Sequence, residues 1–205
     1  MGYSTILDIL GSILIGGMLL LILFRLNDAA VSNSFQYNGE LIIQKNLVEV
    51  VKLLEFDLRK IGYSANWTSI PNPASSILAV DTSKITYLTD LPTSANPYGD
   101  GIVDTLSYFL GPASDLASTP NPNDRILYRQ VNSEPLFGSN LGVTQFEFTF
   151  FDVFGNKLDF PILVPGEIQS MQIDISVEDV AAYDEQYRRV FWRQIRLAAR
   201  NLSNR

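Results

Sequence analysis

The side chains that most often carry chemistry in proteins are scarce in this 205-residue sequence. It has no histidine and no cysteine, which excludes a thiol nucleophile, an imidazole base, a serine–histidine–aspartate triad and a zinc site of Cys or His ligands. Carboxylate chemistry remains, but no pair of acids stands in a recognisable hydrolase motif. Asp100 and Asp104 could offer oxygen atoms to calcium, yet their spacing is not that of an EF-hand loop, and acids beside glycines are commoner in turns. We therefore expect no enzyme, no cofactor and no metal site.

The basic side chains are concentrated at the C-terminus. Six arginines and no acid occur in the last eighteen residues, so a net charge of −7 for the whole chain leaves about −13 for the other 187 residues. An acidic body argues against a nucleic-acid partner. Four of these arginines are candidate contact residues, namely Arg189, Arg193, Arg196 and Arg200.

Two elements could position these arginines. They fit one face of an amphipathic helix lying on anionic lipid, and they also fit a last strand that crosses an acidic neighbour. A basic tail on an acidic body favours head-to-tail contacts that build open filaments. Alternatively, the arginines protect a solvated edge strand from aggregation.

The longest apolar run spans residues 6–26 and contains only two charged residues, Asp8 and Arg25. As a helix it would be about 31 Å long, which matches the hydrocarbon core of a bilayer. A cleaved secretory signal usually has a basic start, and no Lys or Arg precedes this run. A buried core helix would need a polar face, whereas residues 13–24 are apolar or glycine all round. The pattern favours a retained membrane anchor over both alternatives, while Arg25 alone does not specify its orientation.

Three residues within this run are candidates for assembly contacts. Asp8 stands out because ionisable groups in membrane-spanning segments are functional candidates by default. It could instead lie at the headgroups and stabilise the helix N-terminus through the helix dipole. Gly16 and Gly17 are small enough to permit close helix packing.

A second helical segment is predicted at about residues 45–61. Apolar residues recur there at the spacing of one helical face, and Gly62 stands where a helix C-terminus favours a left-handed residue. Between the two segments, Gly39 and the Ser- and Asn-rich stretch 32–38 lower helix propensity, so a local break is plausible. We predict an N-terminal helical region, 1–62, and a β-rich globular domain, 63–205.

The β-rich domain is predicted from short alternating runs separated by Pro- and Gly-rich loops. In the clearest run, Phe146, Phe148 and Phe150 share one face. The run at 168–177 has a similar split, with an apolar face of Met171, Ile173, Ile175 and Val177 and a wet face of Ser170, Gln172, Asp174 and Ser176. Loops are expected at 64–83, 90–101 and 111–124. Trp67 could serve as an exposed contact residue, but a Trp near the end of a long helix is more often packed into the core. The resulting fold class is α+β, a long helix packed on an antiparallel sheet with one buried and one wet face. The predicted strands are 84–89, 103–110, 125–131, 143–152, 168–177 and 189–197.

Several strings resemble, in the correct order, the pilin-like minor pilins and pseudopilins, specifically the W-type minor pilins of type IV pili and the J-type component of type II secretion. The first is Leu54 to Tyr63 (LEFDLRKIGY), similar to that family's "DLR-x-x-GY" helix ending. At its start the chain departs from the family, because a cut after Gly2 would place Asp8 at mature position six instead of five. The other matching strings are 85–90, 104–108, 127–129, 142–148 with 152–156, and 200–202.

The resemblance implies a structural, membrane-anchored subunit that assembles into a type IV pilus or secretion pseudopilus, as a minor or tip-priming component. It implies other pilin-like subunits, the bilayer and an inner-membrane assembly platform as partners, and a location in the bacterial cell envelope with the globular domain periplasmic or on an extracellular filament. It further implies that Asp8 pairs with the N-terminal amine of a neighbouring subunit, and it favours the strand interpretation of the C-terminal arginines. The alternative from another class is a permanently anchored binding or secretion-accessory domain that does not polymerise.

Overall fold

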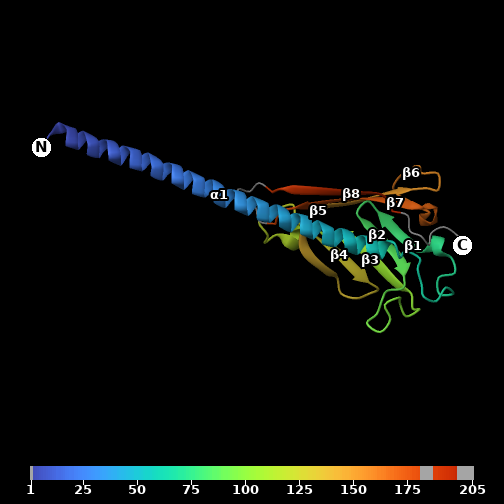
Figure 1. The fold of residues 1–205 in the computed structure, drawn as a ribbon. Coiled ribbons are helices and arrows are strands. Elements are labelled where there is room, and N and C mark those ends of the chain that lie inside the picture. Colours follow the sequence, from blue (N-terminus) through green and yellow to red (C-terminus); the bar gives the residue numbers. More distant parts are fainter. Residues whose placement is uncertain (1, 181–186, 198–205) are drawn as a thin grey trace. The chain divides into compact units, whose positions relative to one another are not determined.

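The computed structural model describes residues 2–180 and 187–197 (Figure 1). The chain divides into two compact units, Met1–Leu41 and Ile42–Arg205. One helix, α1 (Tyr3–Leu58), contributes residues to both units.

Helix α1 is continuous over 56 residues, so the break that the sequence allows near Gly39 does not occur. No proline lies between Tyr3 and Leu58, and each residue there retains the backbone N–H that a helix needs. A single internal glycine lowers helix stability by only about 1 kcal/mol. The polar stretch from residue 27 to residue 44 is therefore helical.

The C-terminus of α1 leads into a tight turn. The helix ends at Leu58, three residues before the predicted end of the amphipathic segment, and the Lys60 and Ile61 N–H groups then donate to the carbonyls of Asp57 and Leu58. Gly62 has a φ of 72°, which confirms the left-handed residue expected there. Its N–H donates to the Leu88 carbonyl at 2.9 Å and so ties the turn to the sheet.

The second unit is built on a curled, eight-stranded antiparallel sheet. The sequence predicts an antiparallel sheet and six of these strands, but not β1 or β6. The strand order is β1-β2-β3-β4-β5-β7-β8, with β6 paired to β5. Three short 3-10 helices, η1 (Pro73–Ser75), η2 (Ala113–Leu116) and η3 (Pro165–Glu167), lie in its connections. The strands are β1 (Ile77–Asp81), β2 (Lys84–Thr89), β3 (Asp104–Leu110), β4 (Arg125–Val131), β5 (Phe137–Phe151), β6 (Lys157–Leu158), β7 (Ser170–Glu178) and β8 (Arg189–Leu197).

The core of this unit lies between the sheet and the part of α1 that begins at Ile42 (Figure 1). The predicted apolar helix face is confirmed, because Leu47, Val50, Leu54, Leu58 and Ile61 are all at most 7% exposed. On the sheet, the predicted faces of β5 and β7 are buried against this helix face. The residues are Phe146, Phe148 and Phe150 from β5, and Met171, Ile173, Ile175 and Val177 from β7.

Several sequence predictions are wrong in detail. Strand β5 begins at Phe137, six residues before the predicted start at 143, and the expected loop 111–124 contains η2. The expected loop 64–83 contains η1 and β1, which extends the sheet beyond β2. Trp67 is 77% exposed and is not part of the core. The face of β7 predicted to be wet buries Asp174 and Ser176, because cross-strand partners on β8 and β5 cover these polar side chains.

Candidate functional site

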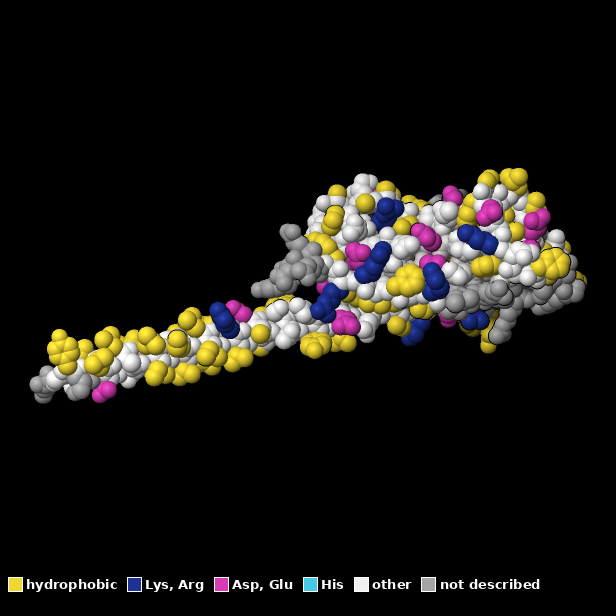
Figure 2. Space-filling view, turned by 90° about the horizontal axis from the view of Figure 1, so that it is seen from above, with side chains coloured by type: hydrophobic (Ala, Val, Ile, Leu, Met, Phe, Trp, Pro, Cys, Tyr) yellow, Lys and Arg dark blue, Asp and Glu magenta, His cyan; other side chains and the backbone are white. Residues whose placement is uncertain are grey.

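The apolar run of the first unit has no protein surface covering it. Every large apolar side chain from Ile6 to Leu26 is more than half exposed, and Figure 2 shows hydrophobic side chains along this part of the helix. Among the described residues, α1 is the one helix long and apolar enough to cross a membrane; a signal sequence near an N-terminus meets the same criteria. The first unit is therefore a possible membrane anchor by length and composition.

The predicted contact residues of the anchor are all solvent-exposed. A Cβ placed on Gly16 or Gly17 would meet no atom within 4 Å, so both glycines leave open space along the helix. The Asp8 carbonyl accepts a hydrogen bond from Ser12 Oγ at 2.7 Å. Within the described part of the chain, neither the Asp8 carboxylate nor the Arg25 guanidinium has an ion-pair or hydrogen-bond partner.

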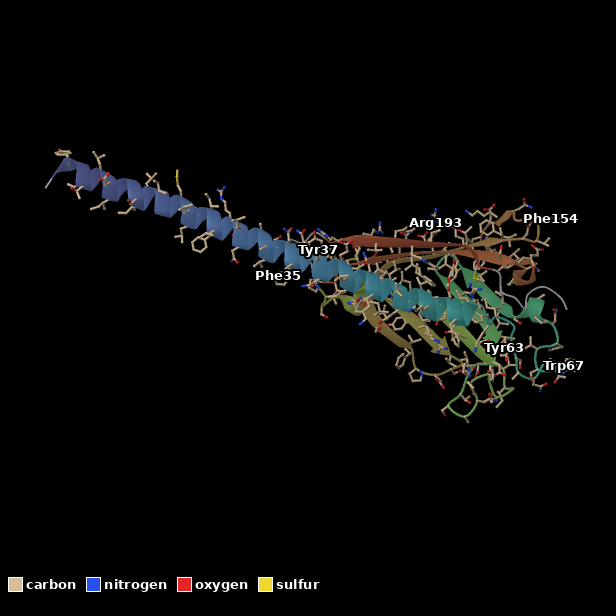
Figure 3. All side chains as sticks on the ribbon, viewed as in Figure 1. Phe35, Tyr37, Tyr63, Trp67, Phe154 and Arg193 are labelled. Atoms are coloured by element: carbon tan, nitrogen blue, oxygen red, sulfur yellow. The ribbon has the colours of Figure 1, made fainter. Side chains whose placement is uncertain are left out.

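Farther along the first unit, two aromatic side chains project from the helix. Phe35 is 58% exposed and Tyr37 is 67% exposed, and Figure 3 shows both pointing away from the helix axis. They add to the apolar surface of the helix beyond the run at 6–26.

In the second unit, a buried carboxylate joins α1 to the centre of the sheet. Asp57, on the last turn of α1, is 1% exposed. Its Oδ2 atom accepts a hydrogen bond from Tyr108 Oη of β3 at 2.5 Å and one from Arg129 Nε of β4 at 2.8 Å. Because a buried charge is tolerated only when it is paired and hydrogen-bonded, these two contacts permit Asp57 to face the core.

Burial and the Asp57 carboxylate also change the pKa values of the tyrosine and arginine side chains around it. Burial and the nearby Asp57 carboxylate raise the pKa of the Tyr108 hydroxyl well above its ordinary value. Burial likewise raises the pKa of Tyr87, whose hydroxyl has no hydrogen-bond partner in the described structure. Burial lowers the pKa of Arg129, but the hydrogen bond and charge of Asp57 outweigh that effect and leave the pKa above its ordinary value. The tyrosines therefore stay neutral and Arg129 stays charged near neutral pH.

A second buried carboxylate, Asp90, holds the loops at the end of α1. It is 0% exposed and accepts hydrogen bonds from the backbone N–H groups of Ala65, Asp100 and Gly101 at 2.9 to 3.0 Å. Gly99, with a φ of 106°, packs so closely that an added Cβ would lie 2.1 Å from Asp90 Oδ1. Asp90 thus fixes the loops on either side of it. Trp67 lies on one of these loops and points away from the domain (Figure 3).

Arg189, Arg193 and Arg196 lie on strand β8, which confirms the strand interpretation over the amphipathic helix for these residues. In β8, Arg193 Nε contacts Asp174 Oδ1 at 2.6 Å and Arg189 Nε contacts Glu178 Oε1 at 3.4 Å, both across the β7–β8 pair. Each arginine side chain remains about half exposed. The backbone of Arg196 belongs to β8, but its side chain and the whole of Arg200 lie outside the described residues.

The two acids considered for calcium act as hydrogen-bond acceptors within the chain. Asp104 accepts from Leu91 N and Asn132 Nδ2, and Asp100 Oδ1 accepts from Ile102 N. In the described ranges, no group of three or more His, Cys, Asp or Glu side chains could hold a metal ion.

Comparisons with protein-family models and with curated proteins find no match to this chain. The structure supports the coarser conclusion: a long, N-terminally apolar helix that packs its C-terminal part on an antiparallel sheet, which is a pilin-like architecture.

Sequence reasoning missed the partners of Asp57 and the role of Asp90. One signal was available for Asp57, because it stands seven residues after Val50 and three after Leu54, on the apolar helix face. A buried acid is tolerated when a cation pairs with it. Arg129 supplies that cation, and it lies in Leu127-Tyr128-Arg129, one of the strings that resemble the pilin-like family. No comparable signal marks Asp90, because its donors are backbone N–H groups of loops.

Proposed function

We propose that this protein is a structural, non-enzymatic subunit that is anchored in the cell-envelope membrane and assembles through its N-terminal helix. The filament would be a type IV pilus or a secretion pseudopilus, with this chain as a minor or tip-priming component. The proposal is supported by helix α1. Its N-terminal apolar part is exposed, and its C-terminal part packs into the core of the sheet domain.

The physical basis is that an apolar helix can exchange one apolar environment for another. Residues 6–26 lie in the bilayer before assembly and against the helices of other subunits after it, so extraction need not expose them to water. The open space at Gly16 and Gly17 supports this role, because neighbouring helices approach most closely where side chains are small.

Asp8 has a specific part in this proposal. An uncompensated carboxylate in an apolar environment is strongly unfavourable, and Asp8 has no partner within the described chain. A cation from a neighbouring subunit, such as its N-terminal amine, would compensate the charge and fix the register of the two helices.

The absence of cysteine in the sequence makes a sharp crosslinking test possible. Gly17→Cys introduces one thiol into the anchor, and Ser133→Cys introduces one at an exposed position of the sheet domain. If helices pack together in the membrane of the native host, oxidation should give disulfide-linked products at position 17 and few at position 133. Negative-stain microscopy of the same cells should show filaments that contain the subunit.

The competing function is an anchored domain that never polymerises. It predicts a monodisperse monomer in detergent, no crosslink at position 17 and no filaments. An Asp8→Ala variant that crosslinks and assembles like the parent would remove the proposed role of Asp8 while leaving helix-mediated assembly intact.

A further inference from the structure

An open groove of about 610 Å³ lies within the second unit, alongside the last turns of α1. Its lining includes Leu53 and Phe56 of the helix and Ile102 of the loop before β3. These three side chains are 46%, 52% and 66% exposed. Large apolar side chains gathered around a concavity are typical of a binding site.

The groove is also acidic. Asp57, Asp100, Asp104 and Glu134 line it together with one base, Arg129, which gives a formal charge of −3. Because Arg129 is already bound to Asp57, the other three acids have no basic partner in the groove. We call this concavity, defined by Leu53, Phe56, Ile102, Asp100, Asp104 and Glu134, the acidic groove.

Two of these acids, Asp100 and Asp104, accept hydrogen bonds from the chain itself. The Asp104 carboxylate accepts from Leu91 N and Asn132 Nδ2, and Asp100 accepts from Ile102 N. The loop that carries Asp100 is held by hydrogen bonds from its Asp100 and Gly101 N–H groups to the Asp90 carboxylate. A segment that presents basic and apolar side chains together would be complementary to this groove in charge and in apolar surface. Because Asp100 and Asp104 are already hydrogen-bonded, their ordering on binding would cost little conformational entropy.

Residues 198–205 of this chain have that composition. Their sequence, Ala-Ala-Arg-Asn-Leu-Ser-Asn-Arg, contains two arginines, one leucine and no acid. Two of the arginines that precede this segment, Arg189 and Arg193, are already paired with acids of β7. Arg200 and Arg205 give this segment two positive charges.

We propose that the acidic groove binds residues 198–205 of a second copy of this chain. Leu202 would pack against Leu53, Phe56 and Ile102, while Arg200 and Arg205 would pair with the acids of the groove. The contact joins two different surfaces of the chain, and a contact of this kind builds an open filament when its rotation does not close. The inference rests on the proposed function, since it names a second contact between assembled subunits.

A binding experiment tests the groove without requiring a filament. A fluorescein-labelled peptide of residues 198–205 is titrated with the full-length chain in detergent and followed by fluorescence anisotropy. Saturable binding that weakens as salt is raised is expected. A scrambled peptide of the same composition, or a Leu202→Ser peptide, should bind at least about threefold more weakly. Equal binding of the scrambled peptide overturns the proposal, because it indicates attraction by charge alone.

Groove variants and a matched control locate the site. Glu134→Lys and Ile102→Ser change exposed side chains and should each weaken peptide binding by at least about threefold. Asp159→Lys makes the same reversal of charge at an exposed acid that does not line the groove, and it should leave affinity nearly unchanged. Equal losses for Glu134→Lys and Asp159→Lys overturn the assignment to the groove.

A crosslink distinguishes a second copy from the chain's own tail. Two differently tagged forms are mixed, one with Ile102→Cys and the other with Leu202→Cys, and the thiols are joined by oxidation. A heterodimer carrying both tags is expected. If the double variant within one chain forms only an intramolecular disulfide and the mixture yields no heterodimer, the second-copy occupant is wrong. Crosslinking at position 17 reports separately on helix-mediated assembly, so failure of either contact can be recognised.

Discussion

At the scale of single residues, the second unit is organised by acids whose partners lie far away in the sequence. Asp57 contacts Arg129 and Tyr108, and Asp90 binds backbone groups of two loops. Both carboxylates are buried, so each would destabilise the fold if its partners were removed. In the anchor, by contrast, Asp8 lacks a partner within the described residues. Asp57 and Asp90 thus serve the internal structure of the domain, whereas the proposed function assigns Asp8 a contact with another molecule.

Replacing Arg129 by methionine should lower the free energy of unfolding of the domain by about 2 to 4 kcal/mol, because Asp57 would be left buried without a cation. The measurement is urea unfolding in detergent, followed by tryptophan fluorescence. Adding Asp57→Asn to Arg129→Met should recover part of the loss. Arg125→Met changes an exposed arginine on the same strand and should alter stability by less than about 0.5 kcal/mol. Equal losses at Arg125 and Arg129 contradict the role of the ion pair.

Asp124 gives a prediction on pH dependence. Burial raises the pKa of this carboxyl in the folded state above its ordinary value, and one of its oxygens has no hydrogen-bond partner in the described structure. A raised pKa means that the folded state binds the proton more tightly, so the stabilisation is complete at low pH and is lost as pH rises through the folded-state pKa. Asp124→Asn cannot lose a proton. The unfolding free energy of Asp124→Asn minus that of the parent should therefore increase as pH rises above about 4; parallel curves would refute this.

At the scale of elements, the two parts of α1 have different distributions of apolar residues. From Ile42 onward its apolar residues fall on one face and pack on the sheet. From Ile6 to Leu26 they surround the axis. The first pattern fits a helix half-covered by protein and the second a helix surrounded by lipid or by other helices. The polar stretch between them is helical as well, so α1 has no hinge at a proline and no break at Gly39.

The loops at the end of α1 depend on glycine at position 99. Gly99→Ala should lower the unfolding free energy by about 2 to 4 kcal/mol, because its φ of 106° disfavours a side chain and the new methyl group would collide with Asp90. Gly166→Ala is the matched control, since its Cβ would make only an ordinary contact 3.5 Å from the Ala74 carbonyl oxygen. Thermal unfolding of the two variants checks the difference. A destabilisation at Gly166 as large as that at Gly99 would show that the close packing against Asp90 is unimportant.

The elements of this fold were largely predictable because each has a strong periodic pattern. The ranges predicted for β2, β4 and β8 match the structure residue for residue, and the Phe146–Phe148–Phe150 face is buried as expected. Strand β1 was missed because it lies among Ser, Asn and Pro residues, and its place at the sheet edge comes from pairing with β2. Trp67 was misplaced because a large aromatic side chain is buried more often than exposed, and sequence alone does not show where a loop turns outward.

At the scale of the whole molecule, function was less predictable than fold. The apolar run indicates a possible membrane anchor, but a contact site depends on residues brought together from distant segments. The acidic groove combines the end of α1 with loops from residues 91 to 134, and no local motif marks that combination. The absence of matching families leaves the pilin-like architecture as the support for assembly.

The membrane anchor itself can be tested by substitutions that leave the second unit unchanged. Leu14 and Leu21 lie seven residues apart in the apolar run, and arginine near the centre of a membrane helix is unfavourable by about 2.5 to 3.5 kcal/mol. The double variant Leu14→Arg/Leu21→Arg should therefore be released from membranes by alkaline carbonate, whereas the parent stays in the pellet. Leu41→Arg places one such charge on an equally exposed leucine outside the run and should remain bound. It is compared with the single variants Leu14→Arg and Leu21→Arg. The intact mass of the membrane-bound parent distinguishes a retained anchor from a cleaved signal. A mass that includes residues 6–26 identifies a retained anchor. A mass without these residues identifies a cleaved signal and removes the basis for helix-mediated assembly.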